Sequence, residues 1–380
     1  MGLGLLKQVK PINKSWVAII DYSIDIGTKK ALVVLRVTLD ALSRRGSAIC
    51  LEDCECIGLK VAEKVNGESI SQDLEQVFSQ AGRPAAIIKD CDRTLHKGVK
   101  LYSEQQGIKL PVIEDIGHVM AAALKSQFEK TEDYKIFTSL VSLSGKNLRQ
   151  TALAFLTPPK LRSKGRFQSI GRLGEWADKV LDILDRLAVG DDVHKDGLLD
   201  KLHEALPNII QSRPFIKRFA STATVLSQVM NILKNKGLDQ ASYEHCRQLS
   251  EQFPDDSKVR GRLLEWLRRH IEIKNTMTSL SLLVSSDIIE SLFGNFKHII
   301  ERSPQADMNR TTLLIPALCG NMDKVTITLV LSQTSHKDLK AWEEENIPYT
   351  MRKRRQAFFA QQKARNQSIN IIDSGGISTA

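Results

Sequence analysis

Three acidic residues far apart in the chain have the setting that metal-dependent chemistry requires. Asp21 follows the apolar run Trp16 to Ile20, Asp90 ends the run that starts at Ala85, and Glu290 lies in an apolar helical pattern. An ionised carboxylate at the end of a buried strand is costly unless it is paired or binds a metal. Taken alone, Asp21 is better explained as a strand-end cap, and only acids elsewhere in the chain favour a cation site. Three carboxylates together would suit two divalent cations, with Mg²⁺ or Mn²⁺ expected from the hard oxygen ligands.

Two neighbouring aspartates compete with these assignments. Asp25 lies four residues beyond Asp21, and a continuing strand would place it about 13 Å away, too far to share one metal pair. Asp92 lies two residues beyond Asp90. We prefer Asp90 because it directly ends the apolar run.

The elements that must position Asp21 and Asp90 form a mixed sheet. Trp16–Ile20 and Ala31–Leu35 are apolar runs that predict the two buried strands of a hairpin, with Gly27 and Thr28 in the turn. Further strands are expected at Ser47–Leu51, Ala85–Asp90 and Lys109–Asp115, and helices at Ser69–Gln80, Leu95–Tyr102 and Gly117–Glu129. This order predicts an α/β sheet with crossovers. Because the carboxyl ends of adjacent parallel strands lie together, Asp21 and Asp90 are expected to converge.

Asp115 and His118 lie where another strand ends and its helix begins. That position makes them candidates to hold the metal ligands in place. The alternative for His118 is a simple hydrogen bond at the helix terminus.

From residue 131 to residue 284 the pattern is helical throughout, which predicts an all-α insertion. Trp176 and Trp266 fall on apolar helical stripes, so packing in the core is preferred over stacking on an unpaired base. Asp287 suits the start of the following helix, and Glu290 and Lys297 are seven residues apart, so both project from one edge of it.

The charge favours a polyanionic partner. The formal net charge is +10 with a pI near 9.2, which suits nucleic acid. The insertion contains a basic loop without an acid, whose candidate DNA contacts are Lys160, Arg162, Lys164 and Arg166, with a solvated linker as the alternative. A second basic segment, Met351–Arg355, precedes Phe358 and Phe359, and disorder is expected from Ser368.

Other classes receive less support. No apolar run has the length of a membrane span, and the N-terminus lacks a signal-peptide pattern, so a cytoplasmic protein is expected. The spacing of Cys50, Cys54 and Cys56 resembles half a zinc site, but no second Cys/His pair at ligand spacing accompanies it. Reduced thiols are the expected state.

Several blocks of the chain resemble the motif blocks of bacterial insertion-sequence transposases with a DDE catalytic domain. They are Trp16–Val37, RPAAIIKDCDRTLHKGVKLY from Arg83, PVIEDIGHVMAAALK from Pro111, LRQTALAFLTPP from Leu148 and SSDIIESLFGNFK from Ser285. The resemblance implies an RNase H-like fold, with the third catalytic acid after a helical insertion. It assigns the triad to Asp21, Asp90 and Glu290, and Lys297 to a DNA phosphate.

The resemblance also implies a domain organisation and partners. Residues 1–130 would begin the catalytic core, 131–284 form the insertion, 285–335 complete the core, and 336–380 form a basic, partly disordered tail. The protein would act on element ends and target DNA as a homo-oligomer at the nucleoid, with two bound ions. In some branches of this transposase family an aromatic residue and an arginine precede the catalytic glutamate. This chain has Leu283 and Ser286 at those positions before Glu290.

Only 15 residues precede Trp16, whereas such transposases usually carry an end-recognition domain there. Two functions are therefore consistent with the sequence. The first is a metal-dependent DNA strand transferase. The second is a truncated, catalytically idle remnant that binds DNA or protein.

Overall fold

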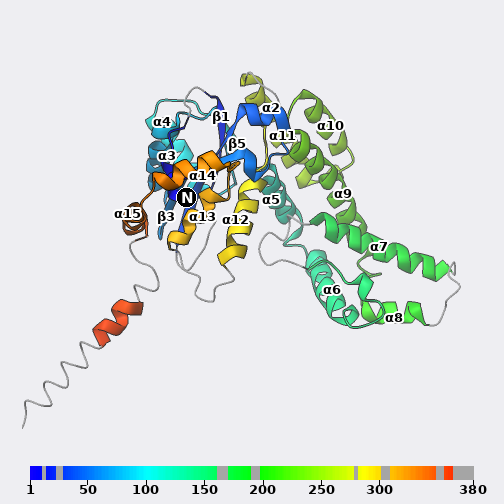
Figure 1. Ribbon diagram of the computed structural model, residues 1–380. Coiled ribbons are helices and arrows are strands. Elements are labelled where there is room, and N and C mark those ends of the chain that lie inside the picture. Colours follow the sequence, from blue (N-terminus) through cyan, green and yellow to red (C-terminus); the bar gives the residue numbers. More distant parts are fainter. Residues whose placement is uncertain are drawn as a thin grey trace, which may run out of the picture. The chain divides into compact units, whose positions relative to one another are not determined.

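The computed structural model describes residues 1–10, 14–22, 29–160, 170–189, 197–277, 281–300, 309–347 and 355–362. The chain divides into two compact units (Figure 1). The sheet unit comprises residues 1–41, 49–112 and 286–380, and the helical unit comprises residues 42–48 and 113–285. The helical unit therefore contains residues 113–130 together with the whole of the predicted insertion, residues 131–284.

The sheet has five strands in the described residues, in the order β3-β2-β1-β4-β5. Their bounds are β1 Trp16–Tyr22, β2 Lys30–Thr38, β3 Cys54–Ala62, β4 Ala86–Lys89 and β5 Val112–Glu114. β1 is central and pairs antiparallel with β2 and parallel with β4. Three consecutive antiparallel strands followed by a parallel fourth give the expected RNase H-like mixed sheet, flanked by helices and interrupted by a helical insertion.

One face of the sheet is covered by α3 (Gly67–Ala81) and α4 (Arg93–Gln105), which lie behind the sheet in Figure 1. Asn66 caps α3 by accepting a hydrogen bond from the Ser69 amide at 2.8 Å, and Gly82, with φ of 79°, ends it. Alternate strand residues, such as Ala18, Ile20 and Ile87, pack into one cluster with the apolar faces of these helices. Strand periodicity thus assigns even positions of β1 to this core.

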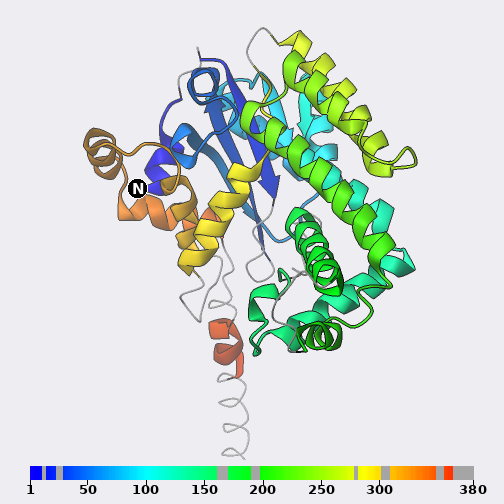
Figure 2. The same ribbon diagram turned by 90° about the vertical axis from the view of Figure 1, so that its right-hand side faces the viewer.

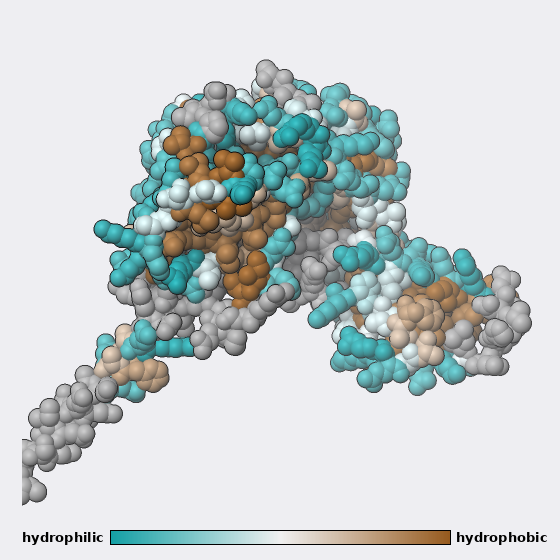
Figure 3. Space-filling view, in the orientation of Figure 1, coloured by the Kyte–Doolittle hydropathy of each residue, from teal (hydrophilic) through white to brown (hydrophobic). Residues whose placement is uncertain are grey.

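The other face of the sheet lies toward α12 (Asp287–Ile300), which contacts β1, and toward α13 (Leu314–Ala317) and α14 (Lys324–Ser332). These helices lie in front of the sheet in Figure 1, and Figure 2 shows them from the side. The N-terminal helix α1 (Gly2–Lys7) packs closely here, because a Cβ on Gly4 would lie 2.5 Å from a methyl group of Val330. α14 otherwise leaves Val325, Leu329 and Leu331 exposed, and Figure 3 shows a hydrophobic area on this side of the sheet unit.

The predicted hairpin is confirmed, and its turn residues Gly27 and Thr28 lie outside the described residues. The strand expected at Ser47–Leu51 is wrong. Residues Leu51–Asp53 form a 3-10 turn instead, in which the Asp53 carboxylate accepts a hydrogen bond from the Cys50 amide at 3.0 Å. The third strand is β3, which is buried at its centre, ends in three half-buried residues and pairs with β2.

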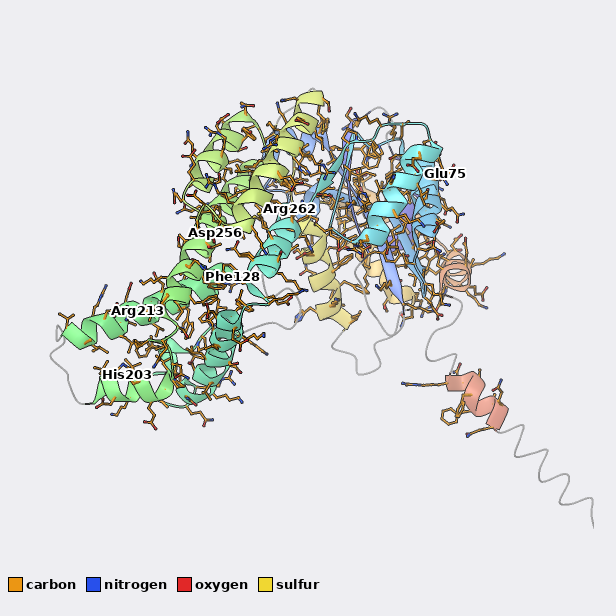
Figure 4. All side chains as sticks on the ribbon, turned by 180° about the vertical axis from the view of Figure 1, so that it is seen from behind. Glu75, Phe128, His203, Arg213, Asp256 and Arg262 are labelled. Carbon is orange, nitrogen blue, oxygen red and sulfur yellow. The ribbon has the colours of Figure 1, made fainter. Side chains whose placement is uncertain are left out.

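The helical unit contains helices only, apart from the end of β5 and one isolated bridge, within its described residues. Its main helices are α5 Ile116–Phe128, α6 Glu132–Leu148, α7 Ile170–Val189, α8 Leu198–Ala205, α9 Arg213–Lys236, α10 Gln240–Ser250 and α11 Lys258–Thr276. Phe128, Phe137, Phe215 and Phe219 form an aromatic core with ring centroids 5.3 to 5.9 Å apart, and Figure 4 labels Phe128. Trp176 and Trp266 are buried, which confirms packing over base stacking.

The C-terminal part contains more helix than the sequence pattern predicts. α15 (His336–Asn346) begins with a capping box in which Ser335 and Asp338 exchange hydrogen bonds. Residues 355–362 are also helical, with Phe358 and Phe359 exposed. Among the described helices, none has the length and apolar character needed to cross a membrane.

The close packing of α3 against α4, which supports β4, can be tested by substitution of a glycine at their contact. A Cβ on Gly98 would lie 2.4 Å from Ile70, so we expect Gly98→Ala to lower the free energy of unfolding by about 1–3 kcal/mol through overpacking. Urea unfolding measures this. The control is Gly294→Ala in α12, where a Cβ meets nothing within 4 Å, so the variant should gain up to about 1 kcal/mol from helix propensity. Equal effects of the two variants would contradict this packing.

Candidate metal and DNA site

Asp21 and Asp90 occupy neighbouring positions at the carboxyl ends of two parallel strands. The last register pair between β1 and β4 is Ile20 with Lys89, so Asp21 and Asp90 are the next residue on each chain. Ile19 and Ile88 form the pair before that, and alternation places both aspartates on their face of the sheet. This is the face opposite the α3 and α4 core. Both side chains are half-buried, so each remains reachable from solvent.

Local hydrogen bonds orient these two carboxylates. The Tyr22 amide donates to Asp21 Oδ1 at 2.5 Å, and the Asp92 amide donates to Asp90 Oδ1 at 2.9 Å. Asp92 has a different role, since its Oδ1 accepts from the Leu95 amide at 2.8 Å and caps α4. This explains Asp92 without any catalytic role. Asp25 lies outside the described residues.

The structure adds a lysine that sequence reasoning missed. Lys89 is 1% exposed, and its Nζ donates to the backbone carbonyl oxygen of Asp90 at 2.9 Å. A buried ammonium group is expensive unless hydrogen bonds satisfy it, so this contact fixes the end of β4 directly beneath Asp90. The sequence does contain a sign of this contact, because Lys89 is a charged residue at the end of the apolar run AAIIK.

A second polar group lies at the same strand ends but on the α3 side. Tyr22, Leu32 and Lys60 form one cross-strand row. The Tyr22 hydroxyl is buried without a hydrogen-bond partner in the described residues. Burial, and then the nearby Asp73 carboxylate, raise the pKa of Tyr22. Burial also raises the pKa of Asp73, and Lys60 opposes that rise.

Glu290 and Lys297 lie on α12, as predicted. Ile289, Leu292 and Phe296 bury one side of the helix, while Glu290 is exposed and Lys297 is half-buried. No group of three His, Cys, Asp or Glu side chains in the described ranges is arranged to hold a metal ion. The strand register therefore brings Asp21 and Asp90 to neighbouring strand ends, and the addition of Glu290 stays a prediction.

Asp115 and His118 belong to the helical unit. Asp115 is 1% exposed and caps α5, because its Oδ1 accepts from the His118 amide at 2.9 Å. The Ser285 hydroxyl lies 3.4 Å from Asp115 Oδ2. The capping role is thus directly visible, and support of metal ligands stays a prediction for both residues.

Next to this cap, His270 is held in its neutral form. Its Nε2 accepts from the Glu114 amide at 3.1 Å, and its Nδ1 lies 2.8 Å from the Trp266 carbonyl oxygen. The ring also stacks on Trp266 with centroids 4.1 Å apart. Burial lowers the pKa of His270 to about 4.

Of the predicted DNA contacts in the insertion, Lys160 is exposed and lies four residues after the 3-10 turn Ala154–Leu156. Arg162, Lys164 and Arg166 lie outside the described residues. The alternative zinc site gains no support, since the described residues offer no suitable ligand group. Burial raises the pKa of Cys56 to about 12 and also raises that of Cys54, which keeps these thiols protonated.

Comparison with solved structures gives a similarity of fold, while two comparisons with sequences find no match. No family model matches the chain, and no curated protein matches it. One similar solved structure is the Drosophila P element transposase strand transfer complex, with a TM-score of 0.40 and 11% sequence identity over 84% of this chain and 80% of that chain. We therefore base the function on this chain's own residues.

The neutral His270 makes the stability of the helical unit depend on pH. The unfolded imidazole takes up a proton near pH 6.5, while the folded one does so only near pH 4. Stability should therefore be full above pH 6.5 and fall as the pH drops toward 4, by about 3 kcal/mol in all. Urea unfolding between pH 7 and pH 4.5 measures the loss.

The same pH series on His270→Gln should show a shallower decline, because Gln has no proton to gain. His245→Gln serves as the matched control, since His245 is exposed on α10 in the same unit, and should keep the wild-type decline. An unchanged decline in His270→Gln would rule out this source of the pH dependence.

Proposed function

We propose that the chain is a DDE transposase, which cleaves DNA at the ends of an insertion sequence and joins the freed strand to target DNA. The observation that carries the proposal is the position of Asp21 and Asp90 next to each other at the ends of β1 and β4. In open α/β sheets, ligands bind outside the carboxyl ends of the strands. The motif blocks described above add support from the sequence.

The two paired residues fit a hard divalent cation. Their donors are carboxylate oxygens, which Mg²⁺ and Mn²⁺ prefer, and their half-buried side chains leave room for ligands from solvent and DNA. Asp21 and Asp90 would hold the ions, with Glu290 as the third acid. When bound, two such ions activate a water or hydroxyl oxygen and stabilise the leaving oxygen of a phosphodiester.

The chain's own cations have separate roles in this proposal. Lys297, seven residues after Glu290 on α12, faces a phosphate near the cleavage point. Lys160, Arg162, Lys164 and Arg166 contact the DNA backbone from the insertion. Phosphate contacts of this kind position DNA without reading its sequence.

We also infer that the protein works as a homo-oligomer on DNA, in the bacterial cytoplasm at the nucleoid. The exposed apolar residues of α14 support the oligomer, since Val325, Leu329 and Leu331 are 46% to 75% exposed on one short helix. Val325 and Leu329 are four residues apart and therefore share one face of α14, and exposed apolar surface is typical of protein interfaces.

A second function, a DNA-binding remnant without cleavage, is favoured by one observation. The formal net charge of +10 favours a polyanionic partner whether or not the chain cleaves DNA. Such a remnant would bind DNA in a salt-sensitive manner and nick none.

The cleavage proposal predicts that Asp21→Asn, Asp90→Asn and Glu290→Gln each lose Mg²⁺-dependent nicking of element-end DNA. The loss should be about a thousandfold, because a misplaced ion removes several kcal/mol of transition-state stabilisation. Nicking of a labelled duplex on a denaturing gel measures it, with circular dichroism to confirm folding.

Asp92→Asn is the matched control. Asn caps helices as well as Asp does, so α4 should stay intact and nicking should remain near the wild-type rate. Full nicking by a folded Asp21→Asn or Asp90→Asn variant would refute the assignment. Salt-sensitive DNA binding without nicking by the wild type would favour the remnant.

A further inference from the structure

The turn that follows α6 presents an exposed aromatic side chain. Phe155 lies in the short 3-10 turn Ala154–Leu156 and is 76% exposed. Its neighbours Leu153 and Leu156 are buried, so the turn inserts an apolar residue on either side of Phe155 into the helical unit. A single exposed apolar residue is ordinary on a protein surface. Phe155 differs from such a residue because its backbone is held by hydrogen bonds and because the surrounding sequence is basic.

The turn is held from several directions. The Leu156 amide donates to the Leu153 carbonyl oxygen at 2.9 Å, and the indole N–H of Trp176 on α7 donates to the Leu156 carbonyl oxygen at 2.8 Å. Pro158 returns to α6, where a Cβ on Gly145 would lie 3.5 Å from its ring. Phe155 is therefore presented on a fixed backbone, which lowers the entropy lost on binding.

The surrounding sequence is strongly basic. From Tyr134 to Gly174 there is no Asp or Glu, while eight residues are Lys or Arg. Three of these cations, Lys146, Arg149 and Lys160, lie within about ten residues of Phe155 in the described chain. All three are exposed, and none forms an ion pair with a described carboxylate. A protein interface centre would be depleted of such charges.

We propose that Phe155 stacks on an unpaired DNA base while Lys146, Arg149 and Lys160 contact the flanking phosphates. Every base offers a π-face to an aromatic ring, and a basic groove beside such a ring is how proteins bind single strands. The inference rests on the proposed function in taking DNA as the partner. It adds that a strand with unpaired bases contacts the insertion at this turn.

The test uses the full chain with a short single-stranded oligonucleotide that carries 2-aminopurine at its centre, in EDTA so that no cleavage occurs. Binding should quench the fluorescence, because the probe base stacks on Phe155. In Phe155→Ala the quenching should disappear and the affinity should fall about 5- to 150-fold. Phe155→Tyr should restore both.

Val189→Ala is the control, since Val189 is 79% exposed in the same unit, and it should bind and quench as the wild type does. Unchanged quenching in Phe155→Ala would overturn the inference, as would equal loss in Val189→Ala. If the wild type nicks DNA but Phe155→Ala quenches as the wild type does, only this inference is refuted. If the wild type quenches through Phe155 but nicks no DNA, only the proposed cleavage is refuted.

Discussion

The parallel pairing of β1 with β4 is the constraint on which the candidate site depends. β1 ends its apolar run at Ile20 and β4 ends at Lys89, and these two residues are register partners. Backbones of paired strands lie about 4.8 Å apart, so the following residues, Asp21 and Asp90, have adjacent backbones. Two ionised carboxylates on adjacent strand ends repel each other. A shared cation would turn this repulsion into attraction.

The rest of the sheet unit keeps that register in place. α3 and α4 cover one face with a continuous apolar cluster, and a slip of one residue would turn every buried side chain of β4 to the other face. The buried Lys89 adds a polar restraint, since its ammonium group binds the carbonyl oxygen of Asp90. Packing on one face thus positions carboxylates on the other. This division explains why the acids can stay half-buried without disturbing the core.

Strong local signals made much of this architecture predictable. The hairpin, β4, α3 and α12 follow from long apolar runs or clear helical periodicity, and Asp21 and Asp90 were singled out because they end two of those runs. The predicted position of the third strand was wrong because the sequence of β3, CECIGLKVA, mixes polar and apolar residues. β3 lies at an edge of the sheet, where pairing with β2 determines which residues form the strand. α1 depends on tertiary contacts, since Gly2 and Gly4 pack against Leu313 and Val330. The position of Glu290 relative to the two aspartates depends on how α12 packs, which no sequence spacing specifies.

The central claim is that Asp21 and Asp90 bind one and the same cation, and a double-mutant cycle on Mn²⁺ affinity tests it most directly. Electron paramagnetic resonance of free Mn²⁺ gives the dissociation constant for the wild type, Asp21→Asn, Asp90→Asn and the double variant. If both carboxylates share an ion, each single variant should lose most of the affinity and the double variant little more, with a coupling free energy above about 1 kcal/mol. Additive losses, or Mn²⁺ affinity that neither substitution changes, would contradict the account.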